Sequence, residues 1–157
     1  MEIIKDSGDR REFESGAVRD MSTPDNPKGR CDLMPLEVVR VLLGNDSIMY
    51  YLNEFLKTNN THNLYSALIE FAAQEYDGKV ETMLLEVAIH YELGSRKYGP
   101  DNWRRSIPTW SYIDSSCRHY IKLLRADDDE RHDRAFVWNL MCCIWEVDHH
   151  AKNSNIL

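Results

Sequence analysis

The sequence predicts an all-α fold, a helical bundle of about five to six helices preceded by an irregular N-terminal arm. Three observations support this prediction. Apolar residues recur at three- and four-residue spacing after residue 35, helix start and stop signals separate these segments, and no segment shows convincing strand alternation. At 157 residues the chain has the usual size of one domain. We expect a single domain over 1–157, with an arm at 1–35, peripheral helices at 36–78 and core helices at 79–150.

The first 35 residues lack helical periodicity and hold three of the five prolines, so we expect an ordered arm or loop with a short helix after Pro35. Two peripheral helices follow, in SIMYYLNEFLKT (47–58) and NLYSALIEFAAQEY (63–76). Each places apolar residues on one helical face, and Asp46 or Ser47 is expected to cap the first. The polar run at 59–63 separates them.

Three longer helices are predicted for the core. The first covers roughly 79–98 and ends at Gly99 and Pro100, a strong C-terminal signal. The second begins near Thr109 and continues to about Arg125. The acidic run at 127–130 then suits the N-terminus of the third, which contains RHDRAFVWNLMCCIWEV (131–147).

The charge balance restricts the partners. Nineteen basic and 26 acidic residues give a net charge of −7, which argues against binding a nucleic acid polymer, since such binding depends mainly on phosphate neutralisation. A small anionic ligand needs only a local basic pocket. The N-terminus has no apolar signal region and no run approaches the roughly 18 apolar residues that span a bilayer, so we expect no membrane association and a cytoplasmic protein.

The four cysteines show no CxxC pair and no spacing typical of a zinc site. We therefore expect reduced and mostly buried thiols.

Several polar groups fall together on predicted helical faces. Glu86, His90 and Lys97 lie at offsets of four and seven, so they point to nearly the same side of their helix, whereas Glu92 faces another. Glu86 and His90 are either a solvated pair or part of an inner polar face. On the next helix, Asp114 and Arg118 are four residues apart and are expected to pair across one turn.

The last helix carries polar residues on an otherwise apolar segment, where buried polar groups need partners, water, metal or ligand. His132 and Asn139 share one face. Glu130 and Asp133 are three residues apart, a spacing that lets two carboxylates converge on one hard cation; alternatively, they only compensate the helix dipole. Such oxygen ligands suit Mg²⁺ or Mn²⁺ better than zinc.

The connection HYELGSRKYGPDNWRRSIPTW (90–110) has more polar and aromatic chemistry than a turn requires. Its Gly99 and Pro100 follow from the helix end. Basic residues here and on the next helix could hold phosphate oxygens, and Tyr98 and Trp103 offer rings on which a base could stack or that complete the core.

Five segments resemble the dATP/dGTP diphosphohydrolase domain family, which is related to the MazG-like all-α nucleotide pyrophosphohydrolases. They are FESGAVRD (13–20), KGRCDLMP (28–35), LLEVAIHYELGSRKYGPDNW (84–103), YIDSSCRHYIKLLR (112–125) and DDERHDRAFVWNLMCCIW (128–145). The resemblance implies metal-dependent hydrolysis of a purine deoxynucleoside triphosphate to the monophosphate and pyrophosphate. MazG-like bundles commonly assemble, so it also implies a homo-oligomer, for which residues 47–76 offer apolar material.

The resemblance and the residue patterns together suggest a site. Its metal ligands would be Glu86, Glu92, Glu130 and Asp133, with Mg²⁺ or Mn²⁺ as cofactor. Catalysis would use Lys97, His119 and His132. Substrate binding would use Arg19, Lys28, Arg30, Tyr98, Asn102, Trp103, Arg118 and Asn139, with Asn102 or Asn139 reading the purine edge.

Two other functions fit the sequence. MazG-like enzymes pair an ExxE with an ExxD, and here only Glu130 and Asp133 have the second spacing. This difference favours a protein that sequesters a nucleotide without cleaving it. The acidic surface also fits a helical module that binds a protein partner.

Overall fold

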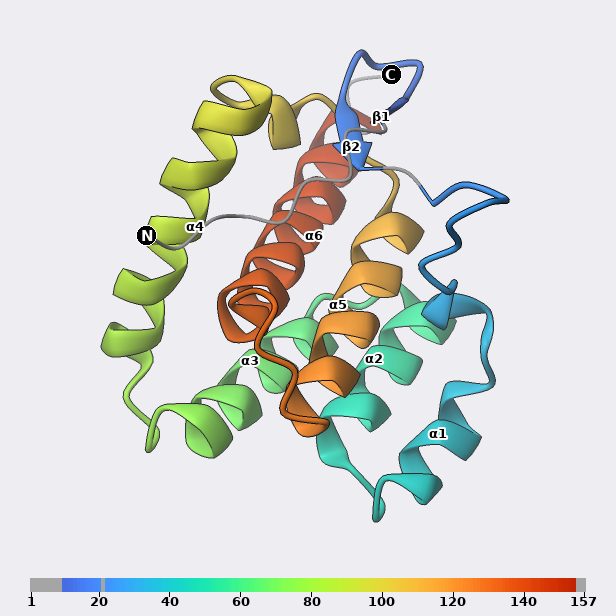
Figure 1. The fold of residues 1–157 in the computed structure, drawn as a ribbon, viewed down its shortest axis with the longest axis vertical. Coiled ribbons are helices and arrows are strands. Elements are labelled where there is room, and N and C mark those ends of the chain that lie inside the picture. Colours follow the sequence, from blue (N-terminus) through green and yellow to red (C-terminus); the bar gives the residue numbers. More distant parts are fainter. Residues whose placement is uncertain (1–9, 21, 155–157) are drawn as a thin grey trace.

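Six α-helices follow one another in the computed structural model, which describes residues 10–20 and 22–154 (Figure 1). This arrangement confirms the predicted all-α fold. The helices are α1 (Leu36–Leu42), α2 (Ser47–Thr58), α3 (His62–Glu75), α4 (Val80–Tyr98), α5 (Thr109–Leu124) and α6 (His132–Ser154), with short 3-10 helices η1 (Cys31–Leu33) and η2 (Asn102–Arg104). No helix within the described ranges is both long enough and apolar enough to cross a bilayer.

The arm contains a small hairpin that the sequence did not predict. Strands β1 (Arg10–Glu12) and β2 (Val18–Asp20) pair antiparallel, with Arg10 opposite Asp20. Gly16, with φ of +86°, allows the chain to reverse between them. Strands of three residues are too short for alternation to be visible in the sequence.

Local signals determine the helix ends as expected. The Asp46 side chain accepts a hydrogen bond from the Met49 backbone N–H at 2.8 Å, which confirms it as the N-cap of α2. Asp46 also accepts a hydrogen bond from the Tyr120 hydroxyl, so the cap joins α2 to α5. Helix α4 ends at Gly99, whose φ of +85° is unfavourable for a residue with a side chain.

The core lies where α5 and α6 pack along one another, and α6 is positioned between α4 and α5 (Figure 1). Tyr112, Tyr120 and Phe136 are fully buried there, and Phe71 of α3 brings its ring to 4.3 Å from that of Phe136. Burying such aromatic side chains supplies much of the hydrophobic stabilisation. All four cysteines are free thiols, and Cys117, Cys142 and Cys143 are buried, as predicted.

Candidate functional site

A pocket of about 450 Å³ is lined by residues of α4, η2, α5 and α6 and by residues 18–20 and 26–28 of the arm. Segments distant in sequence therefore meet around one cavity. Ten of the predicted site residues line it: Arg19, Lys28, Lys97, Tyr98, Asn102, Trp103, Arg118, His119, Glu130 and Asn139.

The structure does not bring the four proposed carboxylate ligands together. Glu92 is 65% exposed and pairs with Arg96 at 3.1 Å. Glu86 accepts hydrogen bonds from Arg134 and, at 3.2 Å, from Arg131. Only Glu130 of the four lines the pocket, so the spacing of Glu130 and Asp133 does not produce a shared centre.

Asp133 is held by other partners. Arg131 donates to it at 2.8 and 2.9 Å, and the Tyr76 hydroxyl donates at 2.6 Å. Burial would raise the pKa of Asp133, but the hydrogen bonds from Arg131 and Tyr76 outweigh burial and lower it to about 2. This carboxylate therefore links α3 to the start of α6.

Asn102 anchors the arm to the pocket. Its side-chain oxygen accepts from the Val18 N–H at 2.9 Å, and its amide nitrogen donates to the Val18 carbonyl at 2.8 Å. The buried Asn102 side chain thus makes the pair of hydrogen bonds to the Val18 backbone that a neighbouring strand would make. Because Arg19 and Asp20 follow Val18 directly, this pair of bonds positions both of them at the pocket.

Arg19 is a partly buried cation whose guanidinium lies against α5 and α6. Its Nη2 donates to Ser115 at 3.0 Å and to Asn139 at 2.9 Å, and its guanidinium faces the rings of Tyr112 and Trp138 at 5.2 and 5.7 Å. Its Nη1 is buried and has no hydrogen-bond partner among the described residues. Burial lowers the pKa of Arg19, although a guanidinium keeps its proton in proteins. An unpartnered donor on a buried cation can bind an anion, a water or another acceptor.

Asp20 is a pocket residue that the sequence analysis missed. Its carboxylate accepts from Lys97 at 3.1 Å, from the Tyr98 hydroxyl at 2.9 Å and from Arg10 at 2.9 Å, with Lys28 Nζ at 3.9 Å. Burial, followed by the Asp20 charge, raises the pKa of Tyr98. No sequence signal marks Asp20, because its hydrogen-bond partners Lys97 and Tyr98 are at least 77 residues away and Arg10 lies across the hairpin.

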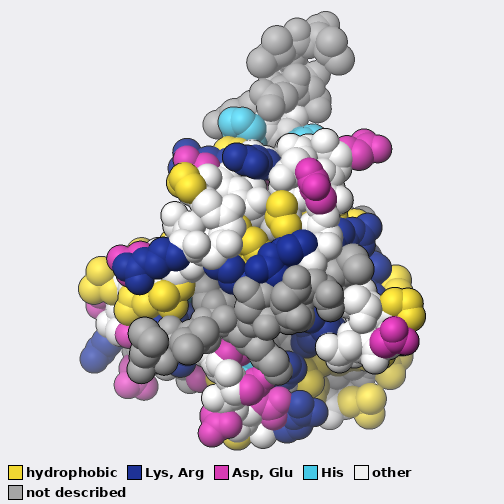
Figure 2. All heavy atoms as spheres, turned by 45° about the horizontal axis from the view of Figure 1, so that its top comes forward, with side chains coloured by type: hydrophobic (Ala, Val, Ile, Leu, Met, Phe, Trp, Pro, Cys, Tyr) yellow, Lys and Arg dark blue, Asp and Glu magenta, His cyan; other side chains and the backbone are white. Residues whose placement is uncertain are grey.

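Basic residues exceed acidic ones around this pocket although the whole chain is acidic. Figure 2, which looks onto the top of Figure 1, shows Lys and Arg side chains gathered in a band across that face. Burial lowers the pKa of Lys28; Asp20 opposes the shift, and the charges of Arg118, Lys97 and Arg19 add to it. The cations are thus close enough to repel one another, and a polyanion would relieve that repulsion.

Arg118 and Arg30 have different positions relative to the pocket. Arg118 pairs with Asp114 at 3.1 Å, as predicted, and donates to the Gly29 carbonyl at 2.8 Å, which ties the arm to α5. Arg30 instead binds Asp32 and covers the Trp110 ring at 4.0 Å. It does not line the pocket.

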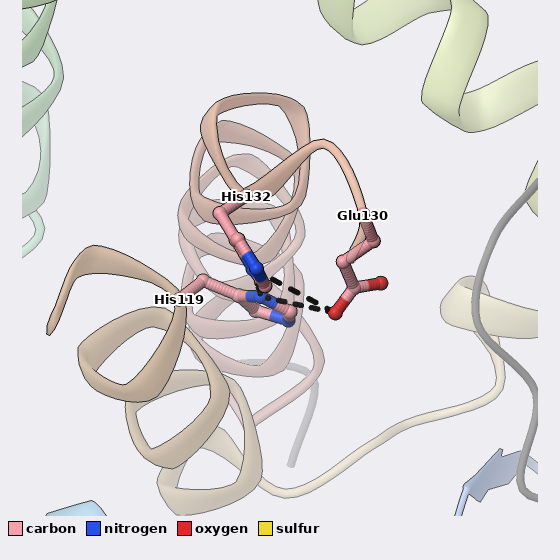
Figure 3. A group of neighbouring side chains, drawn as sticks. All are labelled: His119, Glu130 and His132. Atoms are coloured by element: carbon pink, nitrogen blue, oxygen red, sulfur yellow. Dashed lines mark hydrogen bonds and ion pairs between the residues drawn. The ribbon is translucent and has the colours of Figure 1, made fainter. Parts of the chain in front are cut away.

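Two histidines and one glutamate form a compact group (Figure 3). His119 and Glu130 line the pocket, whereas His132 is fully buried and does not. His119 Nδ1 lies 3.5 Å and His132 Nδ1 lies 3.7 Å from Glu130 Oε1, and the two ring nitrogens are 2.9 Å apart. One ligand atom from each residue falls within 4.8 Å of the others. This set of donors fits a divalent metal ion.

Burial and nearby cations favour the neutral form of His119. Burial first, and then the charges of Arg118 and His132, hold the pKa of His119 well below its usual value, so the ring is neutral near pH 7. His132 is buried, and its Nε2 lies 2.7 Å from Asp129 Oδ1. A neutral imidazole is the form that binds metal. The sequence indicated both histidines as catalytic residues but not their contact.

Aromatic rings form the remaining wall. Trp138 and Tyr91 lie 6.0 Å apart, and Tyr91 meets Trp103 edge-on at 5.7 Å. His90 faces Trp138 at 5.7 Å; burial first, and then the charges of Arg134, Arg19 and Lys97, lower the pKa of His90 to about 4. This wall is apolar and uncharged near pH 7, which suits a nucleobase.

The pocket therefore combines an anion-binding region, a candidate metal centre and an aromatic wall. Residues 72–155, just over half of the chain, match the family model described as dATP/dGTP diphosphohydrolase, N-terminal. No curated protein and no solved structure matches the chain. The match includes α4, α5 and α6, whereas the arm that brings Arg19 and Asp20 lies outside it. On the strength of that match, the chain belongs to the dATP/dGTP diphosphohydrolase, N-terminal, family.

Proposed function

We propose that the protein hydrolyses purine deoxynucleoside triphosphates, dATP or dGTP, to the monophosphate and pyrophosphate in a metal-dependent reaction. The observation that carries this proposal is the buried Arg19 guanidinium, whose Nη1 lacks a partner among the described residues in a pocket that gathers several other cations. The family membership supports the reaction class. The pocket volume of about 450 Å³ lies within the range of small-molecule sites.

The triphosphate is assigned to the basic side of the pocket. Arg19, Lys28, Lys97 and Arg118 would neutralise its oxygens, and Arg19 offers Nη1, which has no hydrogen-bond partner among the described residues. During attack of water on the α-phosphorus, the bond from that phosphorus to the bridging oxygen breaks and pyrophosphate leaves. Lys97 and Arg118 are proposed to stabilise the charge that accumulates on the leaving group.

A divalent ion would be held by His119, Glu130 and His132. When bound, a divalent ion there supplies charge neutralisation for phosphate oxygens and makes a water more acidic. Glu86 is assigned to the Arg134 contact that fixes α4 against α6, and Asp133 to the Tyr76 contact that fixes α3 against α6.

The base is assigned to the aromatic wall, where Trp103 and Trp138 offer ring faces or edges, with Tyr98 near the arm. Asn102 and Asn139 are less suited to reading the purine edge than the sequence suggested. Both side-chain amide atoms of Asn102 bond Val18, and Asn139 accepts from Arg19 and donates to the Ala135 carbonyl at 2.8 Å. We therefore assign them to holding the arm and Arg19.

A panel of nucleotides tests the proposal. The full chain is incubated with each deoxynucleoside and ribonucleoside triphosphate in the presence of Mg²⁺ or Mn²⁺, and the products are separated. Monophosphate and pyrophosphate from dATP or dGTP are expected. Binding of purine triphosphates without turnover under either ion would contradict the enzyme assignment.

Sequestration of a nucleotide is the second candidate. It is favoured by the arrangement of Glu86 and Asp133, since their pairing with arginines leaves Glu130 as the single carboxylate of the candidate metal group that includes His119 and His132. Calorimetric titration with dATP in EDTA separates the two functions. Tight binding that does not need metal favours sequestration, and metal-dependent binding favours catalysis.

A further inference from the structure

We propose that the centre of His119, Glu130 and His132 binds a transition-metal ion such as Mn²⁺, Co²⁺ or Zn²⁺ in preference to Mg²⁺, and that Asp129 is the positioning residue that sets its affinity. The inference rests on the proposed function, because it names the class of ion that the proposed site would use.

The donor atoms distinguish the two classes of ion. The centre offers two imidazole nitrogens and one carboxylate oxygen, at mutual distances of 2.9, 3.5 and 3.7 Å. Mg²⁺ prefers a shell of oxygens in near-octahedral geometry and dehydrates reluctantly. Imidazole is a good ligand for Zn²⁺ and other divalent transition-metal ions, a series in which Mn²⁺, which also accepts oxygen ligands, binds most weakly. Three protein ligands also leave positions for water or phosphate oxygens, as in catalytic metal sites.

The carboxylates that would make the centre oxygen-rich are engaged elsewhere. Glu86 faces Arg134 at 2.6 Å, and Asp133 accepts from Arg131 and Tyr76. Within the described part of the chain, the group that contains Glu130 is completed only by histidines. The family's expected magnesium chemistry therefore does not match the ligands that the fold assembles.

Asp129 determines which nitrogen of His132 faces the centre. The His132 side chain is fully buried, and its Nε2 lies 2.7 Å from Asp129 Oδ1. An ionised carboxylate only accepts hydrogen bonds, so Nε2 of His132 is the nitrogen that donates to Asp129, and Nδ1 is the nitrogen that faces His119 and Glu130. Carboxylates that bond a metal-binding histidine in this way orient the ring and increase its basicity.

The contact between the histidines is consistent with this arrangement. At 2.9 Å, His119 Nδ1 and His132 Nδ1 must share a hydrogen, which His119 donates when Nδ1 of His132 is unprotonated. After His119 moves its proton to Nε2, both lone pairs face the same space. Asp127 also lies near Asp129 and His132, but it accepts two hydrogen bonds from Arg125, so we assign no second ion there.

Metal binding to the full chain, stripped of metal and without nucleotide, tests the proposal. Calorimetry with Mn²⁺, Zn²⁺ and Mg²⁺ is expected to show one ion per chain for the first two, and Mg²⁺ binding weaker by at least roughly 100-fold. Titration with Co²⁺ should produce visible ligand-field absorption typical of nitrogen ligation. Both signals should be lost in His119→Ala and in Glu130→Gln. The glutamine variant preserves the size of the side chain, so it keeps the test valid if the alanine variant fails to fold.

The role of Asp129 has a matched control in the exposed neighbouring Asp128, which carries the same charge in the same loop. Asp129→Ala should weaken Mn²⁺ and Zn²⁺ binding by roughly 10- to 100-fold, the usual effect of removing such a partner. Asp128→Ala should change it by less than about twofold, since it removes only a screened surface charge.

Equal affinity for Mg²⁺ and Mn²⁺, or equal effects of the two aspartate variants, would overturn the proposal. The outcome is separable from that of the proposed function. Turnover of dATP without transition-metal binding to the histidines contradicts this inference and leaves the hydrolase assignment intact. One bound Mn²⁺ per chain without turnover supports this inference and contradicts the hydrolase assignment.

Discussion

At the scale of single residues, Arg19 shows a conflict between stability and binding. A guanidinium in a buried position without a carboxylate within ion-pair distance among the described residues costs free energy of folding. The two ring contacts and the bonds to Ser115 and Asn139 offset part of that cost. An anion bound to the unpartnered Nη1 would offset the rest of that cost.

Arg19→Met should therefore separate the two properties. The melting temperature is expected to stay the same or rise, because a buried cation is replaced by an apolar side chain of similar length. Affinity for dATP should fall roughly 10- to 100-fold, as expected for losing hydrogen bonds from a charged group. Thermal unfolding and calorimetry measure the two effects, with the exposed Arg96→Met as the control. A lower melting temperature with unchanged affinity would show that Arg19 is only structural.

His90 leads to a prediction about pH. Its pKa is lowered to about 4 in the folded chain, so between about pH 6.5 and 4 the unfolded chain binds more protons at this residue than the folded one. The contribution of His90 to stability is therefore lost as the pH falls through that window. His90→Gln should reduce the acid destabilisation at pH 5 by up to about 2 kcal/mol relative to the wild type.

Urea unfolding at pH 5 and pH 7.5 measures this difference. The exposed His62→Gln is the matched control and should leave the pH dependence unchanged. An identical slope in wild type and His90→Gln would mean that the ring is solvated in the folded protein.

At the scale of elements, the arm completes the pocket. Helices α4, α5 and α6 form three sides, and the hairpin brings Arg19 and Asp20 to the fourth. The sequence predicted the helices because their apolar spacing is a local pattern. It predicted that the arm would supply Arg19 and Lys28, but not that Val18 would pair with Asn102, since this contact joins residues 84 positions apart.

Asn102→Ala tests that contact. Removing the side chain leaves the Val18 N–H and carbonyl without their partner, which should cost about 1–3 kcal/mol of local stability. Hydrogen exchange of the Val18 amide should accelerate while exchange in α5 and α6 stays unchanged, and dATP affinity should decrease because Arg19 is no longer held. Asn63→Ala, which removes bonds in the α2–α3 turn, is the control. Unchanged exchange at Val18 would contradict the anchoring role.

At the scale of the whole molecule, the homo-oligomer remains a prediction, and an exposed apolar groove is a suitable surface for its interface. Tyr65 and Ile69 of α3 and Leu84 of α4 are 51%, 59% and 45% exposed and line an apolar groove. Light scattering of the wild type should give a mass above that of one chain, and Ile69→Glu should reduce it by placing a charge in the interface. Ala73→Glu, on an exposed position of the same helix, should not. A monomeric wild type would contradict the prediction.

The whole fold was more predictable than the site. Helix periods and caps such as Asp46 depend on neighbours in sequence, so the all-α bundle follows from local rules. Metal ligands depend on which side chains meet in space. Spacing suggested that Glu130 would act with Asp133, but Arg131 and Tyr76 hold Asp133, and Glu130 turns to His119 and His132.

The central claim is hydrolysis at the α-phosphorus of a purine deoxynucleoside triphosphate, and turnover in oxygen-18-labelled water tests it most directly. We expect dATP or dGTP to give monophosphate that carries the label and pyrophosphate that does not, with Glu130→Gln inactive. Label in the pyrophosphate, release of inorganic phosphate in its place, or no turnover with either Mg²⁺ or Mn²⁺ would contradict the claim.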